Sequence, residues 1–486
     1  MKSNQVLNRA AIVLVPLGMV CLFCPPFLPQ GSAAERSETG YLRLMQGPMV
    51  GAVSDHGFQV WARASGEYSV SVQWGTTFDL KTSQESGSVV ASASDDYTVV
   101  ITVNGLDPDR EYFYRMLVNG EPDRYLKKYP PFRVKTAPTP GTDYDFRMAF
   151  GSCPRFQEDR VQPIWPAVHA LQPDLFLWIG DNIYGDSLYP HVLQEEYRRQ
   201  RDVAGLQPVL RNISNLAIWD DHDYGMNNQD RRNPIKEAAL KIFKDYWANP
   251  SYGLPVTPGV FFRYSYGQVD FFFLDDRYYR DPDPAPQTAE KTMLGAEQLA
   301  WLESELEASR AVFKVLVSGG GWSKAKGATG DSWAAFVDER NKVFDFIRDH
   351  QITGVVLLSG DSHVGELNVI PWSDEGGYDF YDLVSSPLAQ DMPDSWLERR
   401  PERRIRPVYF GGSTVGLVDF LFGPSPRILY RVIDVEGRSV WETFELQADE
   451  LVNGVQSWPS KVGEEQRWRQ KNYEEGKGYY EVPLPD

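Results

Sequence analysis

The chain has few cysteines for its length. It contains 486 residues and 3 cysteines, and two of these, Cys21 and Cys24, lie in an apolar segment near the N-terminus. If that segment is removed, Cys153 is the one cysteine left, and no disulfide can form within the chain. A disulfide-stabilised scaffold is therefore excluded, and the length allows two or three domains, each with its own hydrophobic core.

Positive charge is also scarce. Lys and Arg number 49 against 67 Asp and Glu, so the formal net charge is -18 at pH 7. An acidic chain lacks the basic surface that binds a phosphate backbone, so we expect no dedicated nucleic-acid-binding surface, although nucleic acid stays open as a substrate held through metal ions. With 24% charged and 42% hydrophobic residues, the composition indicates a globular protein rather than a disordered acidic chain or a coiled coil.

Long apolar runs are missing except at the N-terminus. Lys2 and Arg9 precede an apolar segment at 10–28, and the small residues 31–34 follow it. This pattern predicts a secretory signal peptide at 1–34, and therefore a periplasmic or secreted protein with no membrane span after cleavage. A membrane anchor is the alternative, but prolines interrupt the run, and its length is near the lower limit for a span.

Between residues 40 and 138, short segments of alternating polar and apolar residues are separated by turn residues. We expect strands at Gly57–Arg63, Tyr68–Trp74, Thr98–Val103, Tyr112–Val118 and Phe132–Thr136. The segment Gly105–Arg115 resembles the tyrosine corner of fibronectin type III and immunoglobulin-like domains. The pattern predicts an all-β sandwich at 40–138, and the Pro-rich segment 136–141 is expected to be a linker.

After this linker, short apolar segments alternate with segments of helical periodicity. Strands are expected at Asp145–Phe150, Asp174–Ile179, Asn215–Trp219, Val269–Leu274, Phe313–Val317 and Val355–Leu358, and helices at Pro234–Trp247, Gly295–Ala308 and Ala335–Asp349. A hairpin is expected from Ile428 to Leu446, with its turn at Glu436-Gly437. The alternation predicts a layered α/β domain at 145–446, followed by a C-terminal tail at 447–486 that is a candidate lid.

Polar residues directly follow five of the predicted strands. These segments are Gly151-Ser152-Cys153, Gly180-Asp181-Asn182-Ile183-Tyr184, Asp220-Asp221-His222-Asp223, Asp275-Asp276-Arg277 and Ser359-Gly360-Asp361-Ser362-His363. In open α/β sheets, ligands bind beyond the carboxyl ends of the strands, where loops from separate strands meet. The carboxylates would repel one another there unless cations lay between them. The sequence therefore predicts a metal site, with oxygen and imidazole ligands that suit Ca, Mg, Mn or Fe and a thiolate that suits iron or zinc.

These segments resemble the motifs of a known family. Gly180-Asp181, the Asp-Asp-His of 220–222 and the Gly-Asp-Ser-His of 360–363 are similar to the motifs of calcineurin-like metallophosphatases. With Cys153, the segment Leu274–Arg280 and the preceding β-sandwich, the chain resembles the PhoD-type alkaline phosphatases from about Tyr41 to Leu446. The resemblance implies a four-layer α/β sandwich, one Fe3+ and two Ca2+ ions, and hydrolysis of phosphate esters outside the cytoplasm.

The resemblance also assigns roles to individual residues. It implies metal ligands at Cys153, Asp181, Asp221, Asp361 and His363, with Asp181 shared between metals, and it implies a transition-state role for His222. Tyr197 matches the family's tyrosinate ligand, but Tyr184 fits the Gly-Asp-x-x-Tyr motif of purple acid phosphatases, so both stay candidates. Arg277 is a candidate substrate contact, with a salt bridge as the alternative.

Together these features predict an exported, metal-dependent alkaline phosphatase or phosphodiesterase that acts on small phosphate mono- or diesters through a metal-activated water. The alternatives within this chemistry are a purple-acid-type phosphatase and a phospholipase-like diesterase. A different class of protein is a secreted binder of a glycan or a partner, which would use its 14 Trp and 25 Tyr residues. Ionisable residues that gather after strands favour the enzyme.

Overall fold

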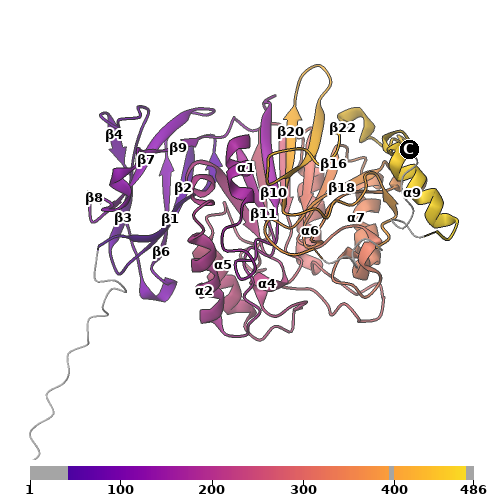
Figure 1. The fold of residues 1–486 in the computed structure, drawn as a ribbon, viewed down its shortest axis with the longest axis horizontal. Coiled ribbons are helices and arrows are strands. Elements are labelled where there is room, and N and C mark those ends of the chain that lie inside the picture. The colour runs from indigo at the N-terminus through magenta and orange to yellow at the C-terminus, as the bar shows by residue number, and fades with distance from the viewer. Residues whose placement is uncertain (1–41, 393–398, 478–486) are drawn as a thin grey trace, which may run out of the picture. The chain divides into compact units, whose positions relative to one another are not determined.

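The computed structural model describes residues 42–392 and 399–477 (Figure 1). The predicted signal peptide at 1–34 lies outside the described residues. Within the part of the chain that is described, every helix is too short or too polar to cross a membrane.

Two antiparallel sheets form the N-terminal part of the described chain. One contains β1 (Leu44–Ser54), β2 (Gly57–Ala64) and β6 (Thr98–Asn104), and the other contains β3 (Ser69–Gly75), β4 (Ser83–Glu85), β5 (Val89–Val90), β7 (Glu111–Val118), β8 (Glu121–Pro122) and β9 (Phe132–Lys135). The sheets face each other, since Phe58 of β2 packs on Tyr114 of β7 with ring centroids 5.8 Å apart. The five expected strands are present. β1 was not expected, because Gly47 and Pro48 interrupt its apolar residues.

The tyrosine corner is also present. The hydroxyl of Tyr112 accepts a hydrogen bond from the backbone N–H of Asp107 at 2.9 Å. This bond back to the chain just upstream is the defining contact of the motif, and it confirms the expectation from the sequence.

Two mixed sheets form the α/β part of the chain. The first has the order β12-β11-β10-β20-β21-β22, with β10 (Phe146–Gly151), β11 (Leu175–Ile179), β12 (Ser214–Ile218), β20 (Thr414–Leu421), β21 (Arg427–Asp434) and β22 (Phe444–Gln447). The second has the order β13-β14-β15-β16-β18-β17-β19, with β13 (Phe262–Tyr266), β14 (Val269–Phe273), β15 (Phe313–Val317), β16 (Val355–Ser359), β17 (Gly365–Ile370), β18 (Phe380–Ser385) and β19 (Arg403–Arg404). The predicted hairpin is confirmed, because Ile428 of β21 pairs with Leu446 of β22.

The two sheets pack face to face, and helices cover their outer faces (Figure 1). Phe420 of the first sheet lies 6.2 Å from Phe271 and 5.8 Å from Phe313 of the second, measured between ring centroids. The helices are α1 (Ile164–Leu171), α2 (Pro190–Arg201), α3 (Gln207–Asn212), α4 (Asp221–Tyr224), α5 (Lys236–Tyr246), α6 (Ala296–Ala308), α7 (Val337–Asp349), α8 (Trp458–Lys461) and α9 (Glu464–Glu474).

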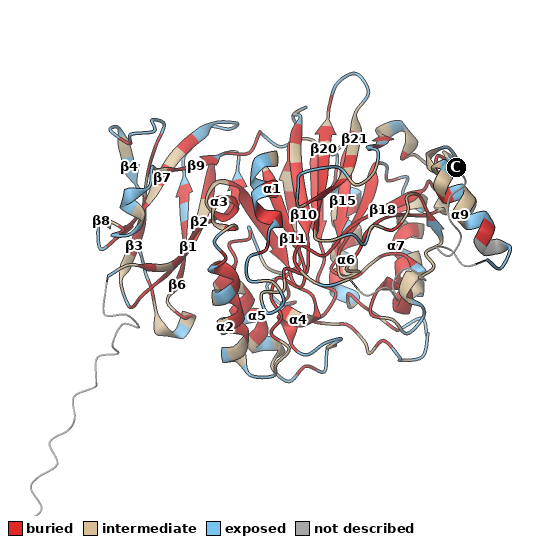
Figure 2. Ribbon diagram, viewed as in Figure 1, coloured by how far each residue is buried: buried red, intermediate tan, exposed pale blue. Residues whose placement is uncertain are grey.

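Aromatic contacts fix two of these helices to opposite sheets. In α1, Trp165 packs on Phe176 of the first sheet, and in α7, Phe344 stacks on Phe380 of the second. The strands between the helices are buried along most of their length (Figure 2). This arrangement confirms the predicted four-layer α/β sandwich.

The C-terminal tail is anchored away from the carboxyl ends of the strands. The backbone N–H groups of Ser457 and Trp458 donate to Asp379 at 2.7 and 2.9 Å, and Gly354 N–H donates to the carbonyl of Leu451 at 3.0 Å. Asp379 and Gly354 precede β18 and β16, so this part of the tail lies at the amino ends of these strands. The predicted site residues follow the carboxyl ends, so the lid prediction is wrong for this anchored segment.

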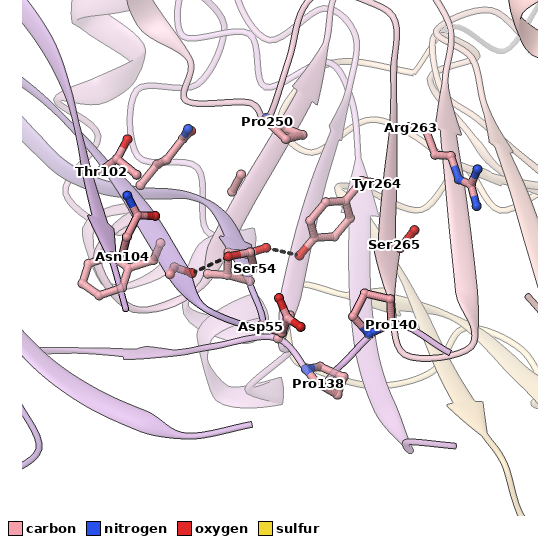
Figure 3. A pocket seen from close by; sticks show the side chains of 16 residues that line it. Ser54, Asp55, Thr102, Asn104, Pro138, Pro140, Pro250, Arg263, Tyr264 and Ser265 are labelled. Atoms are coloured by element: carbon pink, nitrogen blue, oxygen red, sulfur yellow. Dashed lines mark hydrogen bonds between the residues drawn. The ribbon is translucent and has the colours of Figure 1, made fainter. Parts of the chain in front are cut away.

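A groove of about 360 Å³ lies where the N-terminal sheet meets β13 and the linker (Figure 3). Its polar lining includes Asp55, Asn104 and Arg263, and the hydroxyl of Tyr264 donates to the carbonyl of Val53 at 2.9 Å. Within the described chain, the residues that line this groove include none of the predicted metal ligands, so the groove is separate from the metal centre.

Candidate metal centre

The polar segments converge because the strands before them are parallel. β10, β11 and β12 run in one direction within the first sheet, and β14, β15 and β16 do so within the second. Loops after the carboxyl ends of parallel strands meet at one edge of the sheet. The predicted ligands Cys153, Asp181, Asp221, Asp361 and His363 lie there together with His222.

Three groups of side chains each bring their ligand atoms within 4.8 Å of one another. We call them the cysteine set (Cys153, Asp181, His363), the histidine set (Asp181, Asp221, His222) and the carboxylate set (Asp181, Asp220, Asp361). Asp181 belongs to all three, and it is 1% exposed. One buried carboxylate is therefore common to all three candidate ligand sets.

Two glycines allow the loops to approach this closely. A Cβ at Gly180 would lie 2.7 Å from the Cβ of Asp220, and a Cβ at Gly360 would lie 2.5 Å from the hydroxyl oxygen of Ser152. Only glycine fits such contacts, so Gly180 brings the loop after β11 against the loop after β12, and Gly360 joins the loops after β16 and β10.

Four of the predicted ligands have left-handed backbone conformations. The φ angles are 60° at Cys153, 49° at Asp181, 56° at Asp361 and 52° at His363. Residues other than glycine adopt this region at a cost of about 1–3 kcal/mol each, and they do so mainly at functional sites. The shared conformation therefore supports a functional role for this edge of the sheets.

Cys153 is fully buried beside Asp181. Its Sγ lies 3.4 Å from Asp181 Oδ2 and 3.2 Å from the hydroxyl of Ser152. Burial raises the pKa of the Cys153 thiol well above its usual range, and the nearby carboxylates Asp181 and Asp361 raise it further. A thiolate at this position needs an adjacent cation, which agrees with a role as a metal ligand.

Asp220, Asp221 and His222 lie at the start of α4. Asp220 is the N-cap, and its carboxylate and that of Asp223 form a capping box. Asp223 also accepts a hydrogen bond from the backbone N–H of Asn182 at 3.0 Å. Asp223 thereby joins α4 to the loop that follows Asp181, and it fixes the positions of Asp181 and Asp221 relative to each other.

His222 is held on two sides. Its Nδ1 lies 2.6 Å from Asp186 Oδ1, and its ring lies 4.2 Å from the ring of Tyr184, measured between centroids. Burial would lower the pKa of His222, but the carboxylates of Asp181 and Asp221 outweigh burial and raise this pKa to about 10. Because Asp186 occupies Nδ1, the Nε2 atom is the one left for a substrate or a metal.

Asp361 and His363 approach the site from the loop after β16. The backbone N–H of Asp361 donates to the hydroxyl of Ser152 at 3.1 Å, and its carboxylate forms an ion pair with Lys326. Burial lowers the pKa of His363 to about 3, so its imidazole is neutral at ordinary pH. A neutral imidazole is the form that binds metal ions.

The structure brings Tyr184, not Tyr197, into contact with the predicted ligands. The hydroxyl of Tyr184 lies 3.2 Å from Nε2 of His363, whereas the hydroxyl of Tyr197 donates to Asp223 at 2.9 Å. Tyr197 is on α2, where its ring stacks on Tyr246. This placement contradicts the prediction of Tyr197 as the tyrosinate ligand and favours the alternative, Tyr184.

Arg277 is not placed to contact a substrate. Its side chain is fully buried, its Nε donates to Asp220, and its two terminal nitrogens donate to Asp331 at 2.9 and 2.8 Å. All of its donor groups therefore face carboxylates inside the protein. The prediction of Arg277 as a substrate contact is wrong, and the salt-bridge alternative is correct.

Sequence reasoning missed three polar residues at this edge. Asp220 was part of the Asp-Asp-His-Asp segment, but it was not singled out as a ligand. Asp186 carried a weak signal, because it follows the Gly-Asp-x-x-Tyr motif by two residues. Lys326 lies in a polar loop that resembles any exposed turn, so no sequence pattern indicates its contact with Asp361.

The donor groups fit the ions that the resemblance implies. Cys153 and His363 offer a thiolate and an imidazole, which suit iron, and the carboxylates of the other two sets suit calcium. Asp220 Oδ2 is buried and has no hydrogen-bond partner. A buried acceptor without a donor is costly, and a bound cation would satisfy it.

Two protein-family models match the chain. The model of the PhoD-like phosphatase family matches residues 148–403, and that of the PhoD-like phosphatase N-terminal domain matches residues 31–137. Alkaline phosphatase D of Bacillus subtilis (strain 168) is 26% identical over 348 residues, which are 61% of this chain and 58% of that protein. The chain thus spans less than two thirds of the length of this curated relative.

Two solved structures share the fold. The structure of PhoD matches with a TM-score of 0.70 and 20% identity, covering 93% of this chain and 99% of the other. The purple acid phosphatase PPD1 from yellow lupin (Lupinus luteus) seeds matches with a TM-score of 0.56 and 11% identity, covering 82% and 74%. Because the family model spans more than half of its residues, the chain belongs to the PhoD-like phosphatase family.

Proposed function

We propose that this protein is an exported, metal-dependent alkaline phosphatase and phosphodiesterase. The observation that carries the proposal is the position of Asp181, a buried carboxylate common to three candidate ligand sets. A carboxylate shared in this way holds cations next to each other, and adjacent cations can bind two oxygens of one phosphoryl group.

The ions that we propose are Fe3+ and Ca2+. Cys153, His363 and Tyr184 would hold the iron, while Asp181 and Asp221 would provide oxygen ligands for calcium. When bound, such ions activate a water molecule and neutralise the charge of the phosphoryl oxygens. The same oxygen ligands can also bind other divalent metal ions.

His222 is the proposed catalytic residue. The carboxylate of Asp186 contacts Nδ1 of His222, and the ring of Tyr184 packs on the His222 ring. These two contacts fix the orientation of the imidazole and therefore the direction in which Nε2 points. A protonated Nε2 can donate a hydrogen bond to a phosphoryl oxygen or a proton to the leaving group. Both roles stabilise the transition state more than the bound ester.

Arg155 takes the place of Arg277 as the proposed phosphate contact. Its guanidinium lies 4.8 Å from the centroid of the Tyr184 ring, and 35% of its side chain is exposed. A partly exposed guanidinium beside the metal ligands can reach an ester in solution and bind its oxygens in a fork geometry.

The substrates that we propose are small phosphate mono- and diesters. The formal net charge of -18 repels long polyanions, so nucleic acid polymers should be poor substrates at low salt. Cations held by Asp181 and Asp221 would attract a single phosphoryl group at short range, and this local attraction would outweigh the repulsion by the distant surface charge.

Export to the periplasm or the medium is part of the proposal. It rests on the sequence of residues 1–34, with its basic start, apolar segment and small residues before the first acid. The mature chain should begin at Glu35. N-terminal sequencing of protein from the cell envelope or medium would test this, and an intact Met1 in the isolated protein would contradict it.

A purple-acid-type centre is the second candidate, and Tyr184 favours it. Tyr184 lies three residues after Asp181, and its hydroxyl is 3.2 Å from His363 Nε2. A phenolate bound to Fe3+ would give a visible absorption band. Because the first candidate also places Tyr184 on the iron, this band does not separate the two candidates. Activity at acidic rather than alkaline pH would favour the purple-acid-type centre.

Metal removal tests the proposed function directly. Dialysis against a chelator should abolish hydrolysis of p-nitrophenyl phosphate and bis(p-nitrophenyl) phosphate, and added calcium should restore part of it. Asp181→Ala should be inactive with or without metal, whereas Asp374→Ala, an exposed carboxylate, should behave as wild type. Full activity in excess chelator would overturn the metal-dependent mechanism.

A further inference from the structure

A pocket of about 240 Å³ lies between the start of β1, the loop that leads into β9, and α3, which packs beside β1 (Figure 2). Three of its lining residues are basic, Arg43, Lys128 and Arg211, and one, Asp123, is acidic. The chain as a whole has a formal net charge of -18, so an excess of positive charge in one pocket runs against the rest of the molecule. We call it the arginine pocket.

None of these three cations forms an ion pair with a residue in the described part of the chain. Asp123 is buried, and its two oxygens accept hydrogen bonds from three backbone N–H groups at 2.8, 2.9 and 2.9 Å. Asp202 interacts electrostatically with Arg43, but its oxygens accept hydrogen bonds from Gln46 at 3.1 and 3.3 Å. The Nε atoms of Arg43 and Arg211 are buried without a hydrogen-bond acceptor, which is costly unless a ligand supplies one.

The backbone around Arg211 is fixed by contacts between α3 and the N-terminal sheets. The hydroxyl of Tyr114 in β7 donates to the carbonyl of Arg211 at 2.9 Å. The backbone N–H of Arg133 in β9 donates to the side-chain oxygen of Asn212 at 3.0 Å. The pocket is therefore formed before any ligand binds, and a ligand would not have to order it.

Two tyrosines stand beside the cations at the surface. The guanidinium of Arg43 lies 5.0 Å from the ring centroid of Tyr125, and the ammonium of Lys128 lies 5.3 Å from that of Tyr129. The two tyrosines are 41% and 48% exposed. A cation over a ring is attracted to it but keeps its full charge, so both cations stay available to an anion that enters from solvent.

The length of β12 separates the arginine pocket from the metal centre. Arg211 lies in α3, just before β12 begins, whereas Asp221 follows the other end of this strand. β12 has 5 residues and spans about 16 Å at a rise of about 3.3 Å per residue. A small ester bound in the pocket therefore cannot reach the metal ligands at the same time.

We propose that the arginine pocket is a non-catalytic binding site for a phosphate group, either free inorganic phosphate or a phosphate ester. A tetrahedral oxyanion offers several acceptors at once, and guanidinium groups bind such oxygens in a fork geometry. The exposed tyrosines leave room for carbon atoms attached to the phosphate. This inference goes beyond the proposed function, because the pocket needs neither metal ions nor hydrolysis to bind its ligand.

The experiment is calorimetric titration of the full-length chain with inorganic phosphate and, separately, with glucose 1-phosphate. Asp181→Ala is the parent, because it should not bind phosphate at the metal centre or hydrolyse the ester. It should bind one phosphate per chain with a Kd of about 1 mM or lower at low salt. Addition of Arg43→Met or Lys128→Met should weaken binding at least about tenfold, since each removes a charged hydrogen-bond donor.

Lys127→Met is the matched control, since Lys127 is an exposed neighbour of Lys128 that does not line the pocket. It should bind phosphate as the parent does, and sodium acetate at equal ionic strength should not bind. Tighter binding of phosphate than of the ester would identify free phosphate as the occupant, and the reverse would identify a phosphorylated molecule. If Asp181→Ala does not fold, wild type stripped with a chelator provides the same titration.

The outcomes separate this inference from the proposed function. Absence of binding in the parent, equal losses in Lys127→Met and Lys128→Met, or an equal response to acetate would overturn the pocket as a phosphate site. In the wild-type background, Arg43→Met should hydrolyse p-nitrophenyl phosphate at the wild-type rate, and a lower rate at equal metal content would overturn its non-catalytic role. Full activity in excess chelator would overturn the metal-dependent mechanism and leave the pocket intact.

Discussion

At the scale of single residues, the ligands are not equivalent. Asp181 belongs to all three ligand sets, whereas Asp221 belongs to the histidine set alone. A substitution at the shared residue would disrupt every candidate ligand set, while a substitution at an unshared residue would disrupt one. The order in which variants lose metal therefore reports the arrangement of the centre.

We expect Asp181→Ala to lose all bound metal and Asp221→Ala to keep the ion of the cysteine set. The reason is that Cys153, Asp181 and His363 do not depend on Asp221. Metal content per folded chain is the measurement, with circular dichroism as the control for folding. Equal losses in the two variants would contradict a shared carboxylate at Asp181.

Tyr184→Phe should abolish any visible absorption of the iron-loaded protein, and Tyr197→Phe should leave it. The hydroxyl of Tyr184 contacts His363, whereas that of Tyr197 contacts Asp223. Absorption spectra of the two variants at equal iron content are the measurement. The reverse pattern would restore Tyr197 as the ligand and show that α2 moves toward the metals.

Arg277→Met should destabilise the protein rather than weaken substrate binding alone. Removal of one partner from a buried ion pair leaves an uncompensated charge and costs about 3–5 kcal/mol. The free energy of unfolding in urea is the measurement. Lys81→Met serves as the control, because Lys81 pairs with Asp79 at the surface, where 85% and 46% of the two side chains are exposed. An unchanged stability of Arg277→Met with a raised KM would instead support a substrate contact.

At the scale of elements, the close approach of the loops after β10 and β16 sets the geometry of the centre. Ser152 follows β10, and its hydroxyl accepts a hydrogen bond from the backbone N–H of Asp361 after β16. The bond joins the two sheets at the point where their loops carry ligands. A side chain introduced at Gly360 would push these loops apart.

Gly360→Ala should therefore lower metal affinity. The new Cβ would lie 2.5 Å from Ser152 Oγ and 3.2 Å from the carbonyl oxygen of Ile179, so the loop has to shift. Gly321→Ala is a matched control, since no atom lies within 4 Å of its Cβ position. Ca2+ titration of both variants is the measurement, and equal affinities would show that the loop spacing does not limit metal binding.

The strands that could be predicted from the sequence are those whose run of apolar residues is not interrupted by polar residues. β11 and β16 are buried on both faces, so they appear as continuous apolar runs and were expected. β17 and β18 were not, because Asn368 and Asp382 interrupt them with buried polar residues. Sequence periodicity does not reveal a polar side chain that is satisfied inside the fold.

The same limit explains which site residues could be found. Cys153, Asp181 and Asp361 follow strands directly, so the position of the strand predicts the position of the ligand. The burial of Arg277 and the contact of Lys326 with Asp361 depend on loops that pack together only in the folded protein. No spacing in the sequence encodes such a contact.

At the scale of the whole molecule, the described contacts of the C-terminal tail lie away from the edge of the sheets that carries the candidate ligands. Its contacts with Asp379 and Gly354 are at the amino ends of β18 and β16. The structure thus separates the tail anchor from the metal centre by the length of the strands.

Deletion of residues 464–486 should leave the ratio of rates on bulky and small esters unchanged. The variant keeps the anchor at Ser457 and loses α9. The ratio of kcat/KM for bis(p-nitrophenyl) phosphate and p-nitrophenyl phosphate is the measurement, at equal metal content. A selective gain on the bulkier diester would show that the tail does restrict the entrance.

The position of β10 at the centre of the first sheet has a consequence for folding. β10 pairs with β11 nearby in the chain and with β20 on its other side, and the ion pair between Arg147 and Asp419 spans 272 residues. Strands that are far apart in the sequence pair slowly, because closing the long intervening loop costs conformational entropy. During synthesis, the growing chain therefore holds β10 with one open edge until β20 emerges. If the chain is exported as proposed, a route that delivers it unfolded would avoid this exposed intermediate on the cytoplasmic side.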